Sequence, residues 1–161
     1  METLDYIIPG YTSVERDRYE IFWDNIFEEM LLENKYSMLV DILQELHDLT
    51  LDLVPSRKDI HKEFDEYIDI EFIKQKLENK VFSHTDFNGL FSYWIDLVKD
   101  LGSKNDEEVM KDLKQEIVDL SNEYGYTYVL PYAYFELYNQ VNKINEHVTK
   151  IRNRLKERLN N

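Results

Sequence analysis

The chain contains no cysteine, which excludes disulfide bonds, thiolate zinc sites and cysteine nucleophiles. A reducing compartment is compatible with that composition. Glycine and proline are also scarce, at four and three residues among 161, so few positions interrupt regular secondary structure. The four glycines stand apart from one another, and no glycine-rich loop that could cradle a phosphate is present. We therefore expect no nucleotide binding.

Long apolar runs are missing as well. No stretch of the sequence approaches the roughly 18 apolar residues that a membrane-spanning helix requires. Glu2 and Asp5 stand near the first residue with no long apolar segment behind them, unlike the start of a signal peptide. We expect a soluble, cytoplasmic protein without membrane contact.

Positive charge is scarce too. The chain has 19 lysines and arginines against 33 acidic residues, which gives a net charge of −14. This balance opposes nucleic-acid binding, whose affinity comes largely from Lys and Arg that displace counterions. The first 148 residues hold 14 basic and 32 acidic residues, a net charge of −18, whereas the last 13 hold five basic and one acidic, a net charge of +4. These last cations either complement the dipole of a solvated helix end or contact an acidic face within or between molecules: Lys150, Arg152, Arg154, Lys156 and Arg158.

The sequence is rich in the pattern that forms helices. Apolar residues recur at intervals of three and four almost everywhere, and alternating stretches are nearly absent. A chain of 161 residues with 43% hydrophobic residues suits one domain with a substantial core. We predict an all-α fold, a single helical bundle of about six to seven helices over residues 1–161. It would have a short lead over residues 1–12 and a long C-terminal helix over residues 131–159.

Individual residues indicate where some helices begin and end. Thr12 and Glu15 have the spacing of a capping box before the first helix. Pro55 should stop the second, and Asp69 can cap a later one. Gly102 should end a helix in left-handed geometry, and Pro131 suits the first position of the last helix.

The last helix carries a heptad seam, with apolar residues at alternating intervals of four and three. This seam is compatible with two arrangements, a coiled-coil partner or a long helix lying along its own bundle. Its members are Tyr134, Leu137, Val141, Ile144, Val148, Ile151 and Leu155.

Few patterns suggest chemistry. None of the four histidines stands three residues from a glutamate, the spacing that places two metal ligands on one helical face. No serine lies in a nucleophile elbow, and carboxylate pairs arise by chance among 33 acidic residues. We therefore expect no metal, no cofactor, no small-molecule ligand and no enzymatic activity. An enzyme whose acid and base are brought together only in space is the alternative.

Six tyrosines fall between positions 124 and 138. Tyrosine offers a large rigid contact area with a polar tip, and it is enriched at protein interfaces. These rings either divide between the core and the rim of the bundle or form a docking surface at the turn after Gly125 and the start of the last helix. Together with the later seam residues, the candidates for protein interaction are Tyr124, Tyr126, Tyr128, Tyr132, Tyr138, Ile144, Val148, Ile151 and Leu155.

A series of short motifs also runs in a characteristic order: Phe22-Trp23-Asp24, Tyr36, Leu53-Val54-Pro55 followed by Arg57, Ile68-Asp69-Ile70 leading to Ile73, and Asp106-Glu107-Glu108-Val109. The series resembles the N-terminal part of the T-complex protein 11 family domain. The resemblance implies a helical regulatory protein linked to cAMP-dependent protein kinase signalling. Where the family usually has a Cys-Ala-Pro-like turn followed by Arg-Asp, this chain has Gly102-Ser103-Lys104-Asn105-Asp106, so no role of that cysteine or arginine transfers.

Two functions follow from these observations. The first is a non-catalytic regulator that binds another protein through its acidic helical surface, the tyrosine-rich segment or the heptad seam. The second is a structural or assembly protein of a larger particle, for instance a viral one, that oligomerises through its last helix. The single alanine in a chain rich in Asn, Lys and Ile hints at AT-rich coding, as in some large DNA viruses.

Overall fold

The computed structural model describes residues 13–160, with side chains from position 18 onward. The predicted lead over residues 1–12, Thr12 included, lies outside this range, as does the side chain of Glu15. Within the range the chain forms seven α-helices, one short 3-10 helix and no strand, which confirms the all-α prediction. The helices are α1 (Ser13–Leu32), α2 (Ser37–Asp52), α3 (Lys58–Tyr67), α4 (Ile70–Glu78), α5 (His84–Leu101), η1 (Lys104–Asp106), α6 (Glu107–Tyr124) and α7 (Tyr126–Asn160).

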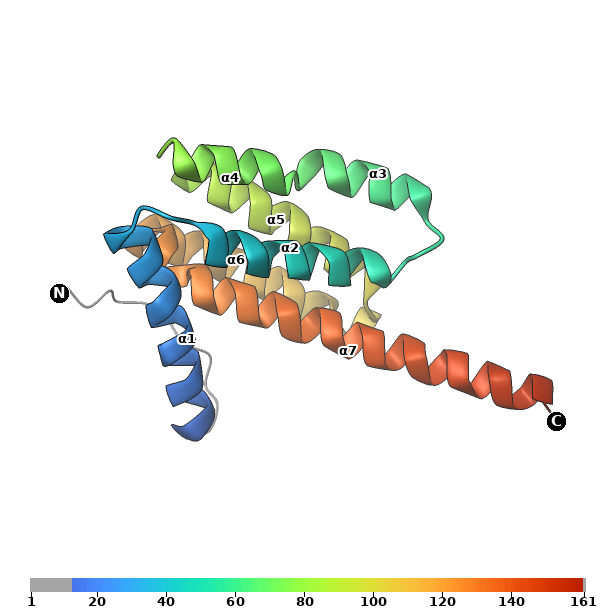
Figure 1. The fold of residues 1–161 in the computed structure, drawn as a ribbon. Helices are drawn as coiled ribbons and strands as arrows, with labels where there is room; N and C mark the ends of the chain where they lie inside the picture. Colours follow the sequence, from blue (N-terminus) through green and yellow to red (C-terminus); the bar gives the residue numbers. More distant parts are fainter. Residues whose placement is uncertain (1–12, 161) are drawn as a thin grey trace.

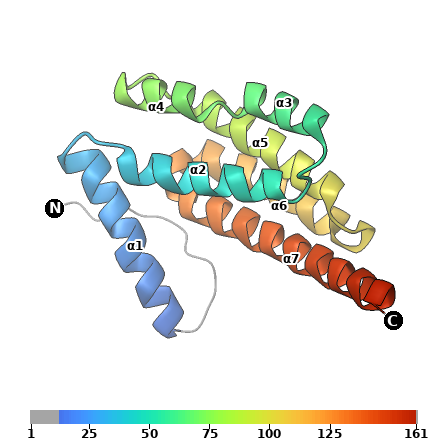
Figure 2. The same ribbon diagram turned by 45° about the vertical axis from the view of Figure 1, so that its right-hand side comes forward.

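The centre of the bundle consists of α5, α6 and α7, which make the most extensive contacts with one another. Helix α2 lies alongside them, and α3 and α4 follow each other along the outer side of α5 (Figure 1). Helix α1 crosses one end of the bundle at a steep angle, as Figure 2 also shows. At the opposite end, α7 runs on past the other helices.

The core is built from large rings and aliphatic side chains. The largest fully buried residues include Trp23, Trp94, Phe64, Phe87 and Phe91. The indole Nε1 of Trp94 donates a 2.9 Å hydrogen bond to the hydroxyl of Thr50, which itself donates to the Leu46 carbonyl at 2.7 Å. This chain of bonds joins α5 to α2 without leaving a buried polar atom of Thr50 unpaired.

Some expected helix ends are correct and others are not. Asp69 caps α4, because its carboxylate accepts a hydrogen bond from the backbone N–H of Phe72. Helix α2 ends at Asp52, shortly before Pro55. Gly102, however, has an extended backbone with φ of −89°, and the left-handed exit is at Gly125, with φ of 93°.

The last helix begins at Tyr126 rather than at position 131, so Pro131 lies inside it and not at its first position. Proline in a helix interior removes one backbone hydrogen bond, which is why the sequence pointed to a later start. Tertiary packing outweighs that loss. The ring of Tyr126 lies 5.5 Å from those of Phe82 and Phe87, and Val129 and Leu130 are buried. The turn expected after Gly125 is therefore absent, and a single residue separates α6 from α7.

None of the helices in the described part of the chain is both long and apolar enough to cross a membrane.

Candidate protein-interaction surface

The heptad seam of α7 divides into a covered part and an open part. Leu137, Val141 and Ile144 are buried against the other helices, and Val148 is half-buried at the edge of the core. Beyond it, Ile151 is 43% exposed and Leu155 is 53% exposed. Helix α7 therefore lies along its own bundle over the first half of the seam, and the second half is exposed.

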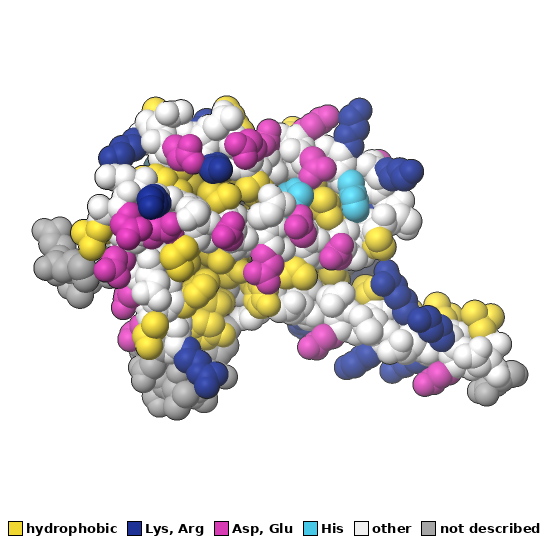
Figure 3. All heavy atoms as spheres, in the orientation of Figure 1, with side chains coloured by type: hydrophobic (Ala, Val, Ile, Leu, Met, Phe, Trp, Pro, Cys, Tyr) yellow, Lys and Arg dark blue, Asp and Glu magenta, His cyan; other side chains and the backbone are white. Residues whose placement is uncertain are grey.

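The open part belongs to the end of α7 that projects from the bundle, residues 149–160, which we call the basic tail. All of its residues are exposed. Leu159, which the sequence analysis did not single out, is 86% exposed and continues the spacing of Ile151 and Leu155 at intervals of four. Figure 3 shows blue cationic and yellow apolar side chains side by side on this projection, whereas magenta carboxylates are spread over the body.

The base of the tail is held by η1. Asp106 accepts hydrogen bonds from Lys143 at 2.8 Å and from Gln140 at 3.2 Å, both on α7. These bonds and a third from Ser103 favour the charged carboxylate, so the pKa of Asp106 lies below its ordinary value. Next to this anchor, an open hollow of about 540 Å³ separates the end of α5 from α7 and includes Leu101 in its lining.

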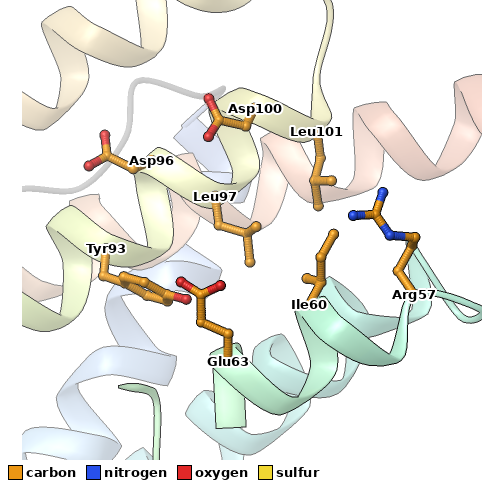
Figure 4. Close-up of a pocket in the computed structure, with 8 residues that line it drawn as sticks. All are labelled: Arg57, Ile60, Glu63, Tyr93, Asp96, Leu97, Asp100 and Leu101. Atoms are coloured by element: carbon orange, nitrogen blue, oxygen red, sulfur yellow. The ribbon is translucent and has the colours of Figure 1, made fainter. Parts of the chain in front are cut away.

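A second open hollow, of about 530 Å³, lies between α3 and α5 at the same end of the bundle. Its floor is apolar, formed by Ile60 from α3 and by Tyr93, Leu97 and Leu101 from α5 (Figure 4). Carboxylates and one guanidinium form its margin. We call it the α3/α5 groove, and its charged margin consists of Arg57, Glu63, Asp96 and Asp100.

The margin of the groove is mainly negative. Arg57 is already paired with Asp59 through two hydrogen bonds of 3.0 and 2.8 Å, which hold the pKa of Asp59 at about 2. Asp96 pairs with Lys114 of α6 at 2.8 Å. Asp100, which is exposed, has no cationic partner within the described residues.

Glu63 and Tyr93 close one side of the groove. Burial of the Tyr93 ring, the nearby Glu63 charge and the hydrogen bond between the two side chains raise the pKa of the Tyr93 phenol to about 12. The phenol therefore stays protonated at neutral pH and donates to the Glu63 carboxylate. This pair gives the groove a fixed polar wall between α3 and α5.

The tyrosine-rich segment is mostly packed within the molecule. Tyr126, Tyr128, Tyr132 and Tyr138 are partly buried against the core, and Tyr134 is buried. The Tyr132 hydroxyl donates to Glu116 at 3.1 Å. Among the candidate tyrosines only Tyr124, at the end of α6, is largely exposed, and its ring lies 4.7 Å from that of Tyr128. Most of these rings therefore connect α7 with the rest of the bundle.

His61 and His47 contact groups of the fold itself. The Nε2 of His61 lies 3.1 and 2.9 Å from the carbonyls of Leu51 and Val54, where it can cap the end of α2. His47 is buried, and its Nε2 lies 2.7 Å from a carboxylate oxygen of Asp65 on α3. No group of three or more His, Asp or Glu side chains in the described range is placed to hold a metal ion.

Sequence reasoning missed the α3/α5 groove because its two sides come from helices far apart along the chain. One signal was present. Tyr93, Leu97 and Leu101 repeat at intervals of four, with Asp96 and Asp100 at the same interval beside them. This pattern marks a half-exposed helix face with an acidic edge.

A protein-family model described as T-complex protein 11 matches residues 4–160, which extends the sequence resemblance well past Val109. Comparisons with curated proteins and with solved structures give no match.

Proposed function

This chain belongs to the T-complex protein 11 family, and we propose that it serves as a non-catalytic regulatory module that binds another protein through its basic tail. The pathway that the resemblance implies is cAMP-dependent protein kinase signalling, and that part of the proposal depends on family resemblance alone.

The observation that carries the proposal is the exposed apolar edge of the basic tail. Ile151, Leu155 and Leu159 lie four residues apart, so they share one side of the helix. Burial of such side chains contributes about 1.5 to 3 kcal/mol each, and an amphipathic helix in an apolar groove is a common form of recognition.

A regulatory rather than catalytic role is supported by what the polar side chains of the bundle contact. Several of the buried or half-buried side chains join helices, as with Thr50 and Trp94, His47 and Asp65, or Asp106 and Lys143. The two described hollows are open, and the carboxylates around the α3/α5 groove lie at its margin. These features favour a surface that recognises another protein.

The test compares proteins captured by the full chain and by a variant with a disrupted tail. Tagged wild type, Ile151→Asp with Leu155→Asp, and the control Val109→Asp serve as baits in an extract of the native host. Val109 is an exposed apolar residue on α6, a different helix from the one that forms the tail. We expect a partner that wild type and the control retain equally and that the tail variant loses by about tenfold or more, the equivalent of about 1.4 kcal/mol.

Circular dichroism of all three baits checks that the bundle is folded. Recovery of no stable partner by wild type, or equal recovery by the tail variant, would contradict the proposal.

A further inference from the structure

We propose that the basic tail of one copy docks in the α3/α5 groove of a second copy, so that two molecules exchange tails. The inference rests on the proposed function, since it takes the basic tail as the binding element and names a second copy of this chain as the partner.

The spacing of the two surfaces agrees. Ile151, Leu155 and Leu159 extend over two intervals of four residues on α7, and Tyr93, Leu97 and Leu101 extend over the same interval on α5. At 1.5 Å per residue, each row is about 12 Å long. Rows of side chains at intervals of four are the ridges that fit into one another when two helices pack. Ile60 completes the apolar floor from the side of α3 (Figure 4).

The charges beside these rows are opposite in sign. The groove has Asp100 on α5 and Glu63 on α3, while Asp96 is already paired with Lys114. The tail has cations at matching intervals of four, namely Arg152 with Lys156 and Arg154 with Arg158. Carboxylates and guanidinium or ammonium groups in such rows make charge-assisted hydrogen bonds that fix the register of two helices.

A second copy, rather than the same molecule, supplies the tail. Helix α7 is continuous from Tyr126 to Asn160 and leads away from the bundle, so its tail cannot turn back into its own groove (Figure 1). Tail and groove nevertheless lie at the same end of the molecule, because Leu101 lines both the groove and the hollow beside α7. Two molecules that meet at these ends can each give and receive a tail, which closes the assembly as a symmetric dimer.

Two other occupants fit the observations less well. A coiled coil of two tails would bring together two segments that each carry five cations and one acid, and the open seam is shorter than the three to four heptads that such pairing needs. An anionic membrane would attract the tail but would repel the body, whose net charge is −18.

The experiment measures the mass of the full chain in solution by sedimentation equilibrium from low to several hundred micromolar. The monomer has a mass of 19.6 kDa, and we expect wild type to approach twice that value as its concentration rises. Leu155→Asp in the tail and Asp100→Arg in the groove should each weaken association by about tenfold or more. Asp100 is chosen because it is exposed and its replacement leaves the Asp96 pair with Lys114 intact. Val109→Asp is the matched control and should associate like wild type.

A mixture of the two variants separates tail exchange from other dimers. Leu155→Asp keeps an intact groove and Asp100→Arg keeps an intact tail, so the mixture restores one of the two contacts. Each homodimer has two damaged contacts, whereas the heterodimer has one intact contact and one that is damaged on both sides. Because we expect one substitution to abolish the contact in which it lies, the second costs nothing further. We therefore expect heterodimers in the mixture at concentrations where each variant alone is monomeric. Retained dimerisation of Asp100→Arg, or no association in the mixture, would overturn the groove as the binding site.

A wild-type chain that stays monomeric throughout the concentration range would overturn the inference as a whole. That result would leave the proposed function standing, because the capture of a different protein by the basic tail is measured separately with the same tail variant.

Discussion

The hydroxyl of Thr50 shows how one buried polar residue can determine the contact between two helices. It accepts the indole N–H of Trp94 and donates to the Leu46 carbonyl, and all three residues are fully buried. We expect Thr50→Val to lower the free energy of unfolding by about 1 to 3 kcal/mol, because it leaves the indole N–H without a partner. Chemical denaturation followed by circular dichroism measures the change.

A double-mutant cycle with Trp94→Phe isolates the hydrogen bond from the loss of ring volume. Once the indole N–H is absent, Thr50→Val should cost much less than it does in the wild type. The expected coupling energy is about 1 kcal/mol. Additive effects of the two substitutions would show that the bond does not contribute to stability.

Asp86 links stability to pH. Its carboxylate accepts hydrogen bonds from Lys76 at 2.8 Å and from the backbone N–H of Ser83 at 2.9 Å, which lower the pKa of Asp86 below 3.8. A lowered pKa in the folded state means that the contribution is full above the unfolded value of about 3.8 and is lost as the pH falls through the folded value. Wild type should therefore exceed Asp86→Asn by about 1 kcal/mol near pH 7, as is typical of a helix cap.

The measurement is urea denaturation of both proteins from pH 7 down to pH 2. The difference between their unfolding free energies should narrow only below about pH 4, since the carboxylate stays charged above that value. A difference that is constant over the whole range would show that the Asp86 charge does not matter.

At the scale of the helices, Gly125 determines where α6 gives way to α7. Its φ of 93° and ψ of 156° lie in a region that essentially only glycine adopts, while the space around it is open. Gly125→Ala should therefore destabilise the fold by about 1 to 3 kcal/mol through backbone strain alone. Thermal and urea denaturation measure the loss.

Gly89 is the matched control, because it lies inside α5 and a methyl group there also meets no atom within 4 Å. Gly89→Ala should raise stability by about 0.5 to 1 kcal/mol, since alanine is the better helix former. Effects of the same sign at both positions would contradict the explanation from backbone conformation.

At the scale of the helices, the spacing of apolar residues predicted some features and missed others. Intervals of three and four predicted the all-α fold and the long last helix correctly, because one buried face per helix imposes that period. The start of α7 was predicted too late, since Pro131 is a local signal and the packing of Tyr126 on Phe82 and Phe87 is not visible along the chain. The heptad spacing gave no indication of where the seam residues become exposed, because that point depends on where the neighbouring helices end.

The groove could not be predicted for a related reason. Its floor joins Ile60 of α3 to Leu97 and Leu101 of α5, and no local rule relates the two helices. By contrast, the opposite charges of body and tail were visible in the sequence. Two explanations fitted them: cations that complement the dipole of a solvated helix end, and cations that contact an acidic face. The proposed tail exchange takes the exposed apolar edge of the projecting tail as part of a contact between molecules.

The molecule as a whole combines an acidic body with a cationic projection at one end, and this separation makes the proposed tail exchange sensitive to salt. Two copies repel each other through their net charge of −14, but this repulsion acts over long distances and is already weak at 0.1 M salt, where the screening length is about 10 Å. The attraction between tail cations and Asp100 acts at contact, and it weakens as the screening length falls to about 3 Å at 1 M.

Association should therefore be strongest near 0.1 M salt and weaker on either side, with a dissociation constant about three- to tenfold higher at 1 M, as expected from one or two exposed ion pairs. Sedimentation equilibrium in a series of NaCl concentrations tests this dependence. Arg152→Gln with Lys156→Gln removes two tail cations, so it should weaken association at 0.1 M and flatten the response up to 1 M. If association instead tightened steadily up to 1 M, the apolar row of Ile151, Leu155 and Leu159 would be the whole contact, and the acidic margin of the groove would have no part in choosing the partner.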